Sequence, residues 1–182
     1  ELLVRESVEG QRATLGDRHN DTLDSITCLA MLLHEQGKLE AAEPLYQEAL
    51  EGRRATLGDR HPDTHGSINN LAMLLKAQGK LEAAEPLYQE ALEGSRATLG
   101  DRHPSTLTSI YSMASLLKAQ GKLEAAEPLF EEELEGCRAT LGDRHSDTLA
   151  SINNLALLLK ARGKLEAAEP LLREALEGRR VT

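Results

Sequence analysis

The sequence predicts an all-α protein, a right-handed superhelix built from antiparallel helix pairs. The main observation is that Leu-Gly-Asp-Arg-His occurs four times, starting at residues 15, 57, 99 and 141, with a constant spacing of 42 residues. A fixed period of this length is typical of stacked helical units that need their neighbours to bury their apolar faces. The composition agrees, because only 2% of residues are aromatic and leucine and alanine must therefore provide the packing.

Within the unit of residues 63–104, apolar residues recur with the spacing of one helical face, at Ile68, Leu71, Ala72 and Leu75. This spacing predicts a first helix, helix A, with Asp63 or Thr64 as its N-cap and an end at Gly79. A second helix, helix B, has its own apolar stripe, at Leu81, Ala84, Tyr88, Ala91 and Leu92. Since only two or three residues join the helices, they must fold back as an antiparallel pair.

The period divides the chain into five parts: a piece of helix B with its turn, then three full repeats and one that stops before its final turn, covering residues 1–20, 21–62, 63–104, 105–146 and 147–182. We therefore expect nine helices, one alone and four pairs. A fragment of a longer array would leave its end repeats uncovered. We expect weak end-to-end self-association from those ends.

Helix B contains residues that conflict with helix rules. Prolines at 44, 86, 128 and 170 indicate that the helix either starts late or bends there, and glycines at 52, 94, 136 and 178 suggest a shared packing reason. Glutamates at 40, 82, 124 and 166, and at 48, 90, 132 and 174, predict a solvated face. Glu133 stands where other repeats have alanine, so we expect it to reach solvent or a basic partner.

Three segments of the repeat carry a family resemblance: Ile68 to Ala72, Gln78 to Tyr88 and Leu99 to Pro104. Together they resemble the 42-residue tetratricopeptide repeat of kinesin light chains. The resemblance covers essentially the whole chain. It implies a solenoid of helix pairs that binds other proteins, without naming the partner.

The differences between repeats point to a binding surface on the A helices. Residues 21–62 and 63–104 differ at seven positions, and six of these lie on helix A, mostly away from its apolar stripe. In a solenoid these surfaces line the concave side, where extended ligands bind. The alternative is that exposed positions simply drift. The candidate groove residues are His34, Arg53, Asn69, Asn70, Met73, Lys76, Lys118, Asn153, Asn154, Leu157 and Lys160.

The resemblance to kinesin light chains implies roles for some of these residues. In that family, the asparagine before Leu-Ala and the basic residue six positions later line a groove for short acidic peptides. The matching residues here are Asn70 and Lys76, and Asn154 and Lys160. The family's base near the end of helix B corresponds to Arg53 and Arg179. Cys28 and Ser112 replace the asparagine in other repeats, and Ser95 and Cys137 replace the arginine.

Several functional classes find no support in the sequence. A net charge of −9 disfavours nucleic acid, and no apolar run is long enough to span a membrane. The histidines at 19, 61, 103 and 145 recur one repeat apart, too far for a shared metal ion, and are expected to build the turns. No motif indicates an enzyme or a cofactor. Cys28 and Cys137 are expected to be free thiols in the cytoplasm.

We therefore expect a noncatalytic protein interaction module that binds an extended, acidic peptide in its concave groove. The alternative is a structural scaffold that self-associates and has no dedicated ligand. Such similar repeats fit recent duplication and deliberate construction equally well.

Overall fold

The computed structural model describes the backbone of residues 1–180 and the side chains of residues 1–178. This part of the chain forms nine α-helices and no strand: α1 (Leu2–Leu15), α2 (Asn20–Glu35), α3 (Leu39–Leu57), α4 (Pro62–Ala77), α5 (Leu81–Leu99), α6 (Pro104–Ala119), α7 (Leu123–Leu141), α8 (Ser146–Ala161) and α9 (Leu165–Arg180). The predicted all-α fold is confirmed. Helices α2, α4, α6 and α8 are the A helices, and α1, α3, α5, α7 and α9 are the B helices.

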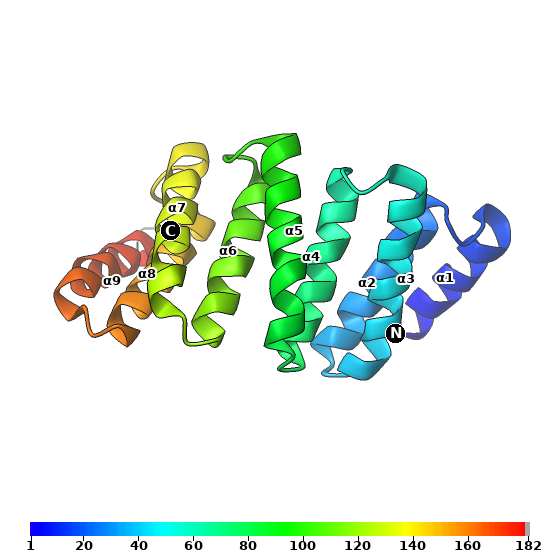
Figure 1. Ribbon diagram of the computed structural model, residues 1–182, viewed down its shortest axis with the longest axis horizontal. Helices are drawn as coiled ribbons and strands as arrows, with labels where there is room; N and C mark the ends of the chain where they lie inside the picture. The colour runs from blue at the N-terminus through cyan, green and yellow to red at the C-terminus, as the bar shows by residue number, and fades with distance from the viewer. Residues whose placement is uncertain (181–182) are drawn as a thin grey trace. The chain divides into compact units, whose positions relative to one another are not determined.

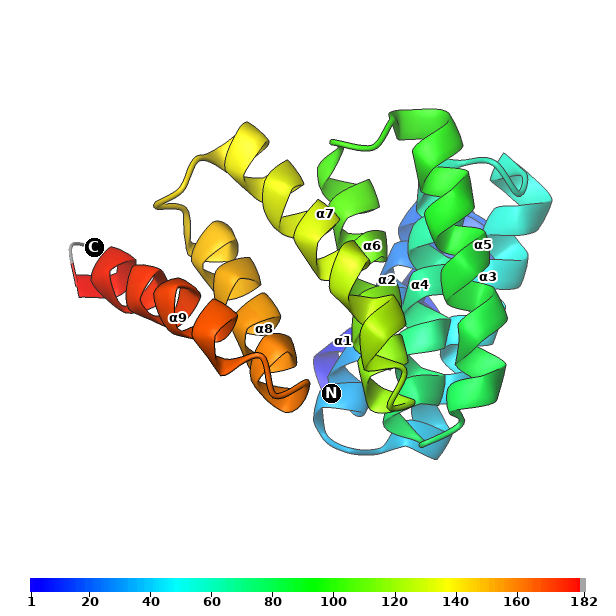
Figure 2. The same ribbon diagram turned by 60° about the vertical axis from the view of Figure 1, so that its left-hand side comes forward.

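The chain divides into two compact units, residues 1–94 and 95–182, with α5 crossing the boundary. In the first unit α2 packs on α1 and α3, and α3 also packs on α4 (Figure 1). In the second unit α7 packs between α6 and α8, and α8 packs on α9, as Figure 2 shows. The A helices α2 and α8 therefore contact a B helix on both sides, so their apolar faces are covered by neighbouring repeats.

The turns before the A helices are built by histidine. His61 is the N-cap of α4, and its Nδ1 accepts a hydrogen bond from the Asp63 amide at 3.2 Å. Pro62 is the first helical residue, a position that suits its fixed φ. The predicted N-cap at Asp63 or Thr64 is therefore wrong, and the Thr64 hydroxyl instead donates to the Gly58 carbonyl at 2.8 Å. The histidines at 19, 103 and 145 cap their helices in the same way, so the predicted turn role is confirmed.

The recurring glycines of helix B lie where an A helix packs closely. A Cβ added to Gly52 would meet the Leu23 side chain at 2.5 Å, and one on Gly136 would meet Leu107 at 2.3 Å. The expected packing reason is confirmed. Helix α3 starts at Leu39 and runs through Pro44, which excludes a late start, one of the two alternatives given for the prolines.

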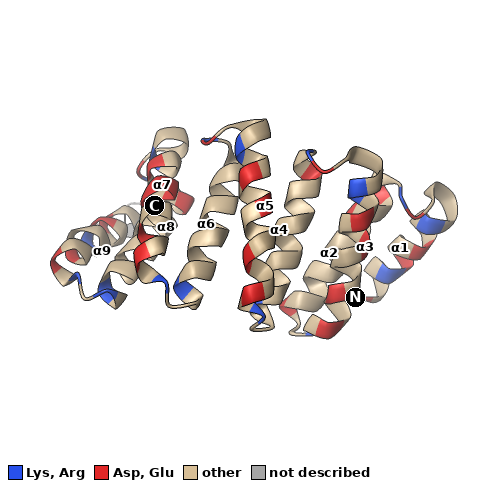
Figure 3. Cartoon of the chain, viewed as in Figure 1, with Lys and Arg blue, Asp and Glu red and all other residues tan. Residues whose placement is uncertain are grey.

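One of the two rows of glutamates predicted to be solvated, at 48, 90, 132 and 174, instead forms ion pairs with the neighbouring repeat. Each of these carboxylates contacts an arginine of the preceding B helix, in the pairs Arg12–Glu48, Arg54–Glu90, Arg96–Glu132 and Arg138–Glu174, at 2.5 to 2.6 Å. The same arginines lie near the aspartates of the Leu-Gly-Asp-Arg-His turns. The other row, at 40, 82, 124 and 166, is exposed as expected. Figure 3 shows acidic charge along α5 and α7, whereas α4 and α6 are mostly uncharged.

Candidate functional site

Three of the four A helices carry a large apolar side chain at equivalent positions of their outward faces, whereas α6 has Ser115 there. Met31 on α2, Met73 on α4 and Leu157 on α8 are 42%, 37% and 41% exposed. Each lies on a helix whose predicted apolar stripe is buried, so exposure at these positions is specific to one side of the helix. We call this face, in each unit separately, the A-helix surface.

The predicted groove residues are placed unevenly on this surface. The half-buried ones are His34, Asn69, Asn70, Lys76, Lys118, Asn153 and Asn154, whereas Lys160 is exposed. The Asn69 Oδ1 has no hydrogen-bond partner among the described residues. The structure thus brings Asn70, Met73 and Lys76 together along α4, and the equivalent residues 154, 157 and 160 together along α8. Arg179 was expected to extend this set, but its side chain lies outside the described residues.

Arg53 differs from the prediction. The sequence assigns Arg53 to the ligand-binding surface, but the structure buries it at 7% exposure between α2 and α4. Its Nη1 donates to Ser67 Oγ at 2.5 Å and to Thr27 Oγ1 at 3.3 Å, and its Nη2 donates to Asp24 at 2.5 Å. The guanidinium is therefore already occupied, and it joins two neighbouring A helices.

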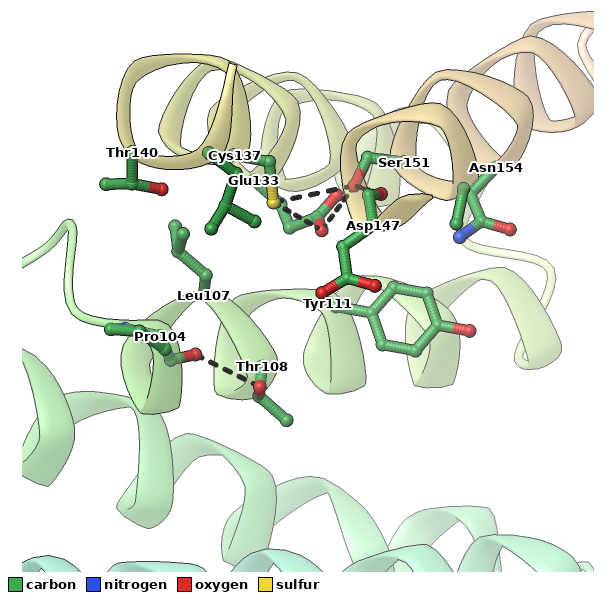
Figure 4. Close-up of a pocket in the computed structure, with 12 residues that line it drawn as sticks. Pro104, Leu107, Thr108, Tyr111, Glu133, Cys137, Thr140, Asp147, Ser151 and Asn154 are labelled. Carbon is green, nitrogen blue, oxygen red and sulfur yellow. Dashed lines mark hydrogen bonds between the residues drawn. The ribbon is translucent and has the colours of Figure 1, made fainter. Parts of the chain in front are cut away.

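The second unit contains a pocket of about 340 Å³ that is lined by residues of α6, α7 and α8. Figure 4 shows Glu133 and Cys137 of α7 grouped with Ser151 of α8, and Tyr111 on α6 across from them. The other lining residues include Pro104 and Leu107 of α6 on the apolar side, and Asp147 and Asn154 on the side formed by α8. A pocket of this volume is at the small end of ligand-binding cavities.

Glu133 contradicts the prediction that it reaches solvent or a basic partner. It is 7% exposed, and its Oε1 accepts hydrogen bonds from the Ser151 hydroxyl at 2.7 Å and the Cys137 thiol at 3.4 Å. Its Oε2 has no hydrogen-bond partner among the described residues. The physical reason is position: residue 133 belongs to the apolar stripe of α7, which faces the interior whatever its side chain.

Burial changes the acid–base properties of this group of residues. It raises the pKa of the Glu133 carboxyl, an effect that the hydrogen bonds from Ser151 and Cys137 oppose and the nearby Asp147 carboxylate adds to. Burial also raises the pKa of the Cys137 thiol to about 11. The thiol is therefore not a reactive nucleophile at neutral pH. Both cysteines are free, Cys28 exposed and Cys137 buried.

Sequence reasoning missed two parts of this site. Tyr111 is 38% exposed at the pocket, and its ring packs edge-on against Phe130 at a centroid distance of 6.1 Å. The pocket itself was also missed. The available signal was that Glu133 and Cys137, four residues apart on one helix face, both depart from the other repeats.

Stacked antiparallel helix pairs with an exposed face on alternate helices define a helical repeat scaffold. Profiles described as tetratricopeptide repeat match residues 22–63, 63–135 and 108–180. The chain belongs to the tetratricopeptide repeat family. A search of curated proteins found no match.

Solved structures extend this result to kinesin light chain-like repeats. The chain is similar to the crystal structure of BtubC (BKLC) from P. vanneervenii, with a TM-score of 0.86 and 26% identity over 100% of this chain and 72% of that one. It is also similar to two crystal structures of a Podosopora anserina putative kinesin light chain with nearly identical TPR-like repeats, one of them a variant. Their TM-scores are 0.81 for the variant and 0.78 for the other, both with 28% identity over 97% of this chain and 84% of that one. The resemblance inferred from the repeat motifs is confirmed.

Proposed function

We propose that this chain is a noncatalytic protein interaction module that binds an extended peptide on its A-helix surface. Tetratricopeptide repeats generally mediate protein–protein interaction or scaffolding. The observation that carries the proposal is the recurrence of exposed apolar side chains at one helix position, in Met31, Met73 and Leu157. Scattered exposed apolar residues are ordinary, but side chains that recur at one helix position, as Met31 and Met73 do within the first unit, are suited to an extended chain.

The lysines give the proposed ligand an acidic character. Lys118 and Lys160 lie in the last turns of α6 and α8, and Lys160 follows the exposed Leu157 by three residues on the same helix. Opposite charges on a peptide would steer its association and fix its register. Lysine near a helix C-terminus also complements the helix dipole, so the test must separate binding from stability.

The test uses two charge reversals in the second unit. A peptide library is screened against the chain, and the best acidic peptide is then measured by fluorescence anisotropy against Lys160→Glu and Arg173→Glu. Both substitutions change the net charge by the same amount, but Arg173 lies on α9 and pairs with Glu169 one turn away. We expect Lys160→Glu to weaken binding and its salt dependence, whereas Arg173→Glu leaves both nearly unchanged. Equal effects would contradict the placement of the ligand on the A helices.

A structural scaffold is the second candidate, and exposed leucines favour it. Leu2 and Leu3 on α1 are 70% and 79% exposed, and Leu165 and Leu176 on α9 are 61% and 59% exposed. Apolar side chains of this exposure suit weak self-association. Light scattering over a concentration series tests it: a rising mass supports the scaffold, and a constant monomer mass up to millimolar concentration contradicts it.

The proposed cellular location follows from the cysteines. No described helix combines the length and apolar character needed to cross a membrane. We infer that the protein works in the cytoplasm because both of its cysteines are free thiols. An oxidising location would instead be indicated if the purified native protein carried either thiol as a mixed disulfide.

A further inference from the structure

The pocket of the second unit and the buried Arg53 of the first unit occupy equivalent places in the repeat. They are two periods apart, so that Cys137 corresponds to Arg53 and Ser151 corresponds to Ser67. The two places therefore show what the same backbone arrangement does with and without an arginine side chain.

In the first unit the guanidinium of Arg53 fills this space. It reaches the carboxylate of Asp24 on α2 and the hydroxyl of Ser67 on α4, both at 2.5 Å. A planar guanidinium carries five donors and suits a space lined by a carboxylate and hydroxyls.

In the second unit the arginine is missing, and of its three acceptors only the serine has a counterpart, Ser151. Cys137 is too short to fill the space, which stays open as the pocket. Ser151 matches the serine of the first unit, and the carboxylate is supplied by Glu133 of α7, because Thr108 stands where Asp24 stands in α2. The second unit therefore has a carboxylate and a serine hydroxyl, as the first unit does, but no arginine to donate hydrogen bonds to them.

Glu133 is the strongest indication that a ligand belongs here. It is more than nine-tenths buried, lines the pocket and has a carboxylate oxygen without a hydrogen-bond donor among the described residues. A buried carboxylate without a cation or a full set of donors is costly. The missing component is a donor that carries positive charge.

The other walls suit the rest of an arginine side chain. Tyr111 is partly exposed at the pocket, and aromatic faces stack with guanidinium groups. Leu107 and Pro104 form an apolar wall for the aliphatic stem, while Asp147 adds a second carboxylate, as Figure 4 shows. Lysine would satisfy the charge, but its compact ammonium cannot bond in a fork or stack in the same way.

We propose that this pocket binds an arginine side chain of the partner peptide. The proposal rests on the proposed function, since the pocket opens between the A helices α6 and α8. A peptide with acidic residues toward Lys118 and Lys160 and an arginine in the pocket fits both charges of this unit. The partner's arginine would place a guanidinium in this pocket, as Arg53 places one in the equivalent space of the first unit.

The direct test is an NMR titration with N-acetylarginine amide, with N-acetylcitrulline amide as the matched neutral compound. We expect saturable amide shifts at Ser151 and Asn154 with the arginine compound, and binding at least about tenfold weaker with citrulline. Glu133→Gln keeps the shape and is expected to weaken arginine binding by a similar factor. Saturable shifts that avoid the pocket, or equal binding of the two compounds, would overturn the proposal.

Two arginine variants make the test sharper. Cys137→Arg is expected to place a guanidinium in the pocket, abolish binding of the compound and raise the midpoint of urea unfolding. Arg53→Ala is expected to open a second site, with new shifts at Ser67. If Cys137→Arg still binds the compound at Ser151 as tightly as the original chain, the pocket assignment is wrong.

The same titration separates this proposal from the proposed function. Binding of N-acetylarginine amide does not depend on whether the lysines contact a peptide. If the compound binds the pocket while Lys160→Glu leaves peptide binding intact, the lysine surface assignment fails and the pocket stands. If peptides respond to Lys160→Glu but the compound does not bind, the pocket proposal fails alone.

Discussion

Substituting alanine at two helical glycines of the first unit should have different effects on stability. Gly66 of α4 has nothing within 4 Å of a Cβ built on it, whereas a Cβ on Gly52 of α3 would lie 2.5 Å from Leu23 Cδ2 and 3.0 Å from Cδ1. Alanine is favoured over glycine inside a helix by about 1 kcal/mol. We therefore expect Gly66→Ala to stabilise the protein by about that amount.

Gly52→Ala gains the same helix propensity but forces Leu23 to move. Leu23 has no exposed surface and cannot turn into solvent. Overpacking of this kind is destabilising by about 1–3 kcal/mol. Subtracting the gain of about 1 kcal/mol leaves Gly52→Ala neutral to destabilising by about 2 kcal/mol.

The assay is urea unfolding followed by circular dichroism, with the two variants compared at unchanged slope. The control is Leu23→Val in the Gly52→Ala background, which removes the colliding carbon. It should recover part of the loss, as a coupled pair does in a double-mutant cycle. A Gly52→Ala variant as stable as Gly66→Ala would refute the close packing of α3 on α2.

Three further outcomes are expected. Burial raises the pKa of Glu133, so the cost of its carboxylate to folding grows as the pH rises above the unfolded pKa of about 4.5. Glu133→Ala should therefore increase the free energy of unfolding, measured in urea, by about 1 kcal/mol or more at pH 7 and by less at pH 4. Burial lowers the pKa of His65, so the free energy of unfolding is highest above the unfolded pKa of about 6.5 and falls as the pH drops below it. His65→Leu should reduce this loss of stability between pH 7.5 and 5. An unchanged dependence of the free energy of unfolding on pH would contradict the prediction. Arg54→Ala removes exposed pairs with Glu90 and Asp59 and should destabilise by less than about 1 kcal/mol, with the difference shrinking in high salt; a larger, salt-independent loss would contradict a surface pair.

The sequence was sufficient for the helix pairs because their signals are local and repeated. The stripe from Ile68 to Leu75 and the turn glycines recur from unit to unit, so each repeat supports the assignment of the others. His61 was missed as an N-cap because aspartate and threonine follow it and are more usual at that position. Its ring nitrogen accepts the same hydrogen bond that their oxygens would.

The pocket and the placement of Arg53 depend on neighbours that one repeat does not show. Arg53 is on α3 but its acceptors are on α2 and α4, so its burial requires the positions of three helices. Likewise Cys137 leaves a space only because α6 and α8 surround it. Positions at which one repeat differs from the others indicate candidate sites. The stacking of the helices then determines whether the side chain at such a position faces solvent, a neighbouring helix or a cavity.

The most direct test of the central claim is an NMR map of the chain with the best acidic peptide from the library. If the A helices bind the partner, the amide shifts should concentrate on A-helix residues such as Asn70 and Met73 in the first unit, or Asn154 and Leu157 in the second. Exposed B-helix residues such as Glu40 should stay unchanged. Shifts confined to the B helices, or to the leucines of α1 and α9, would contradict a peptide-binding surface on the A helices.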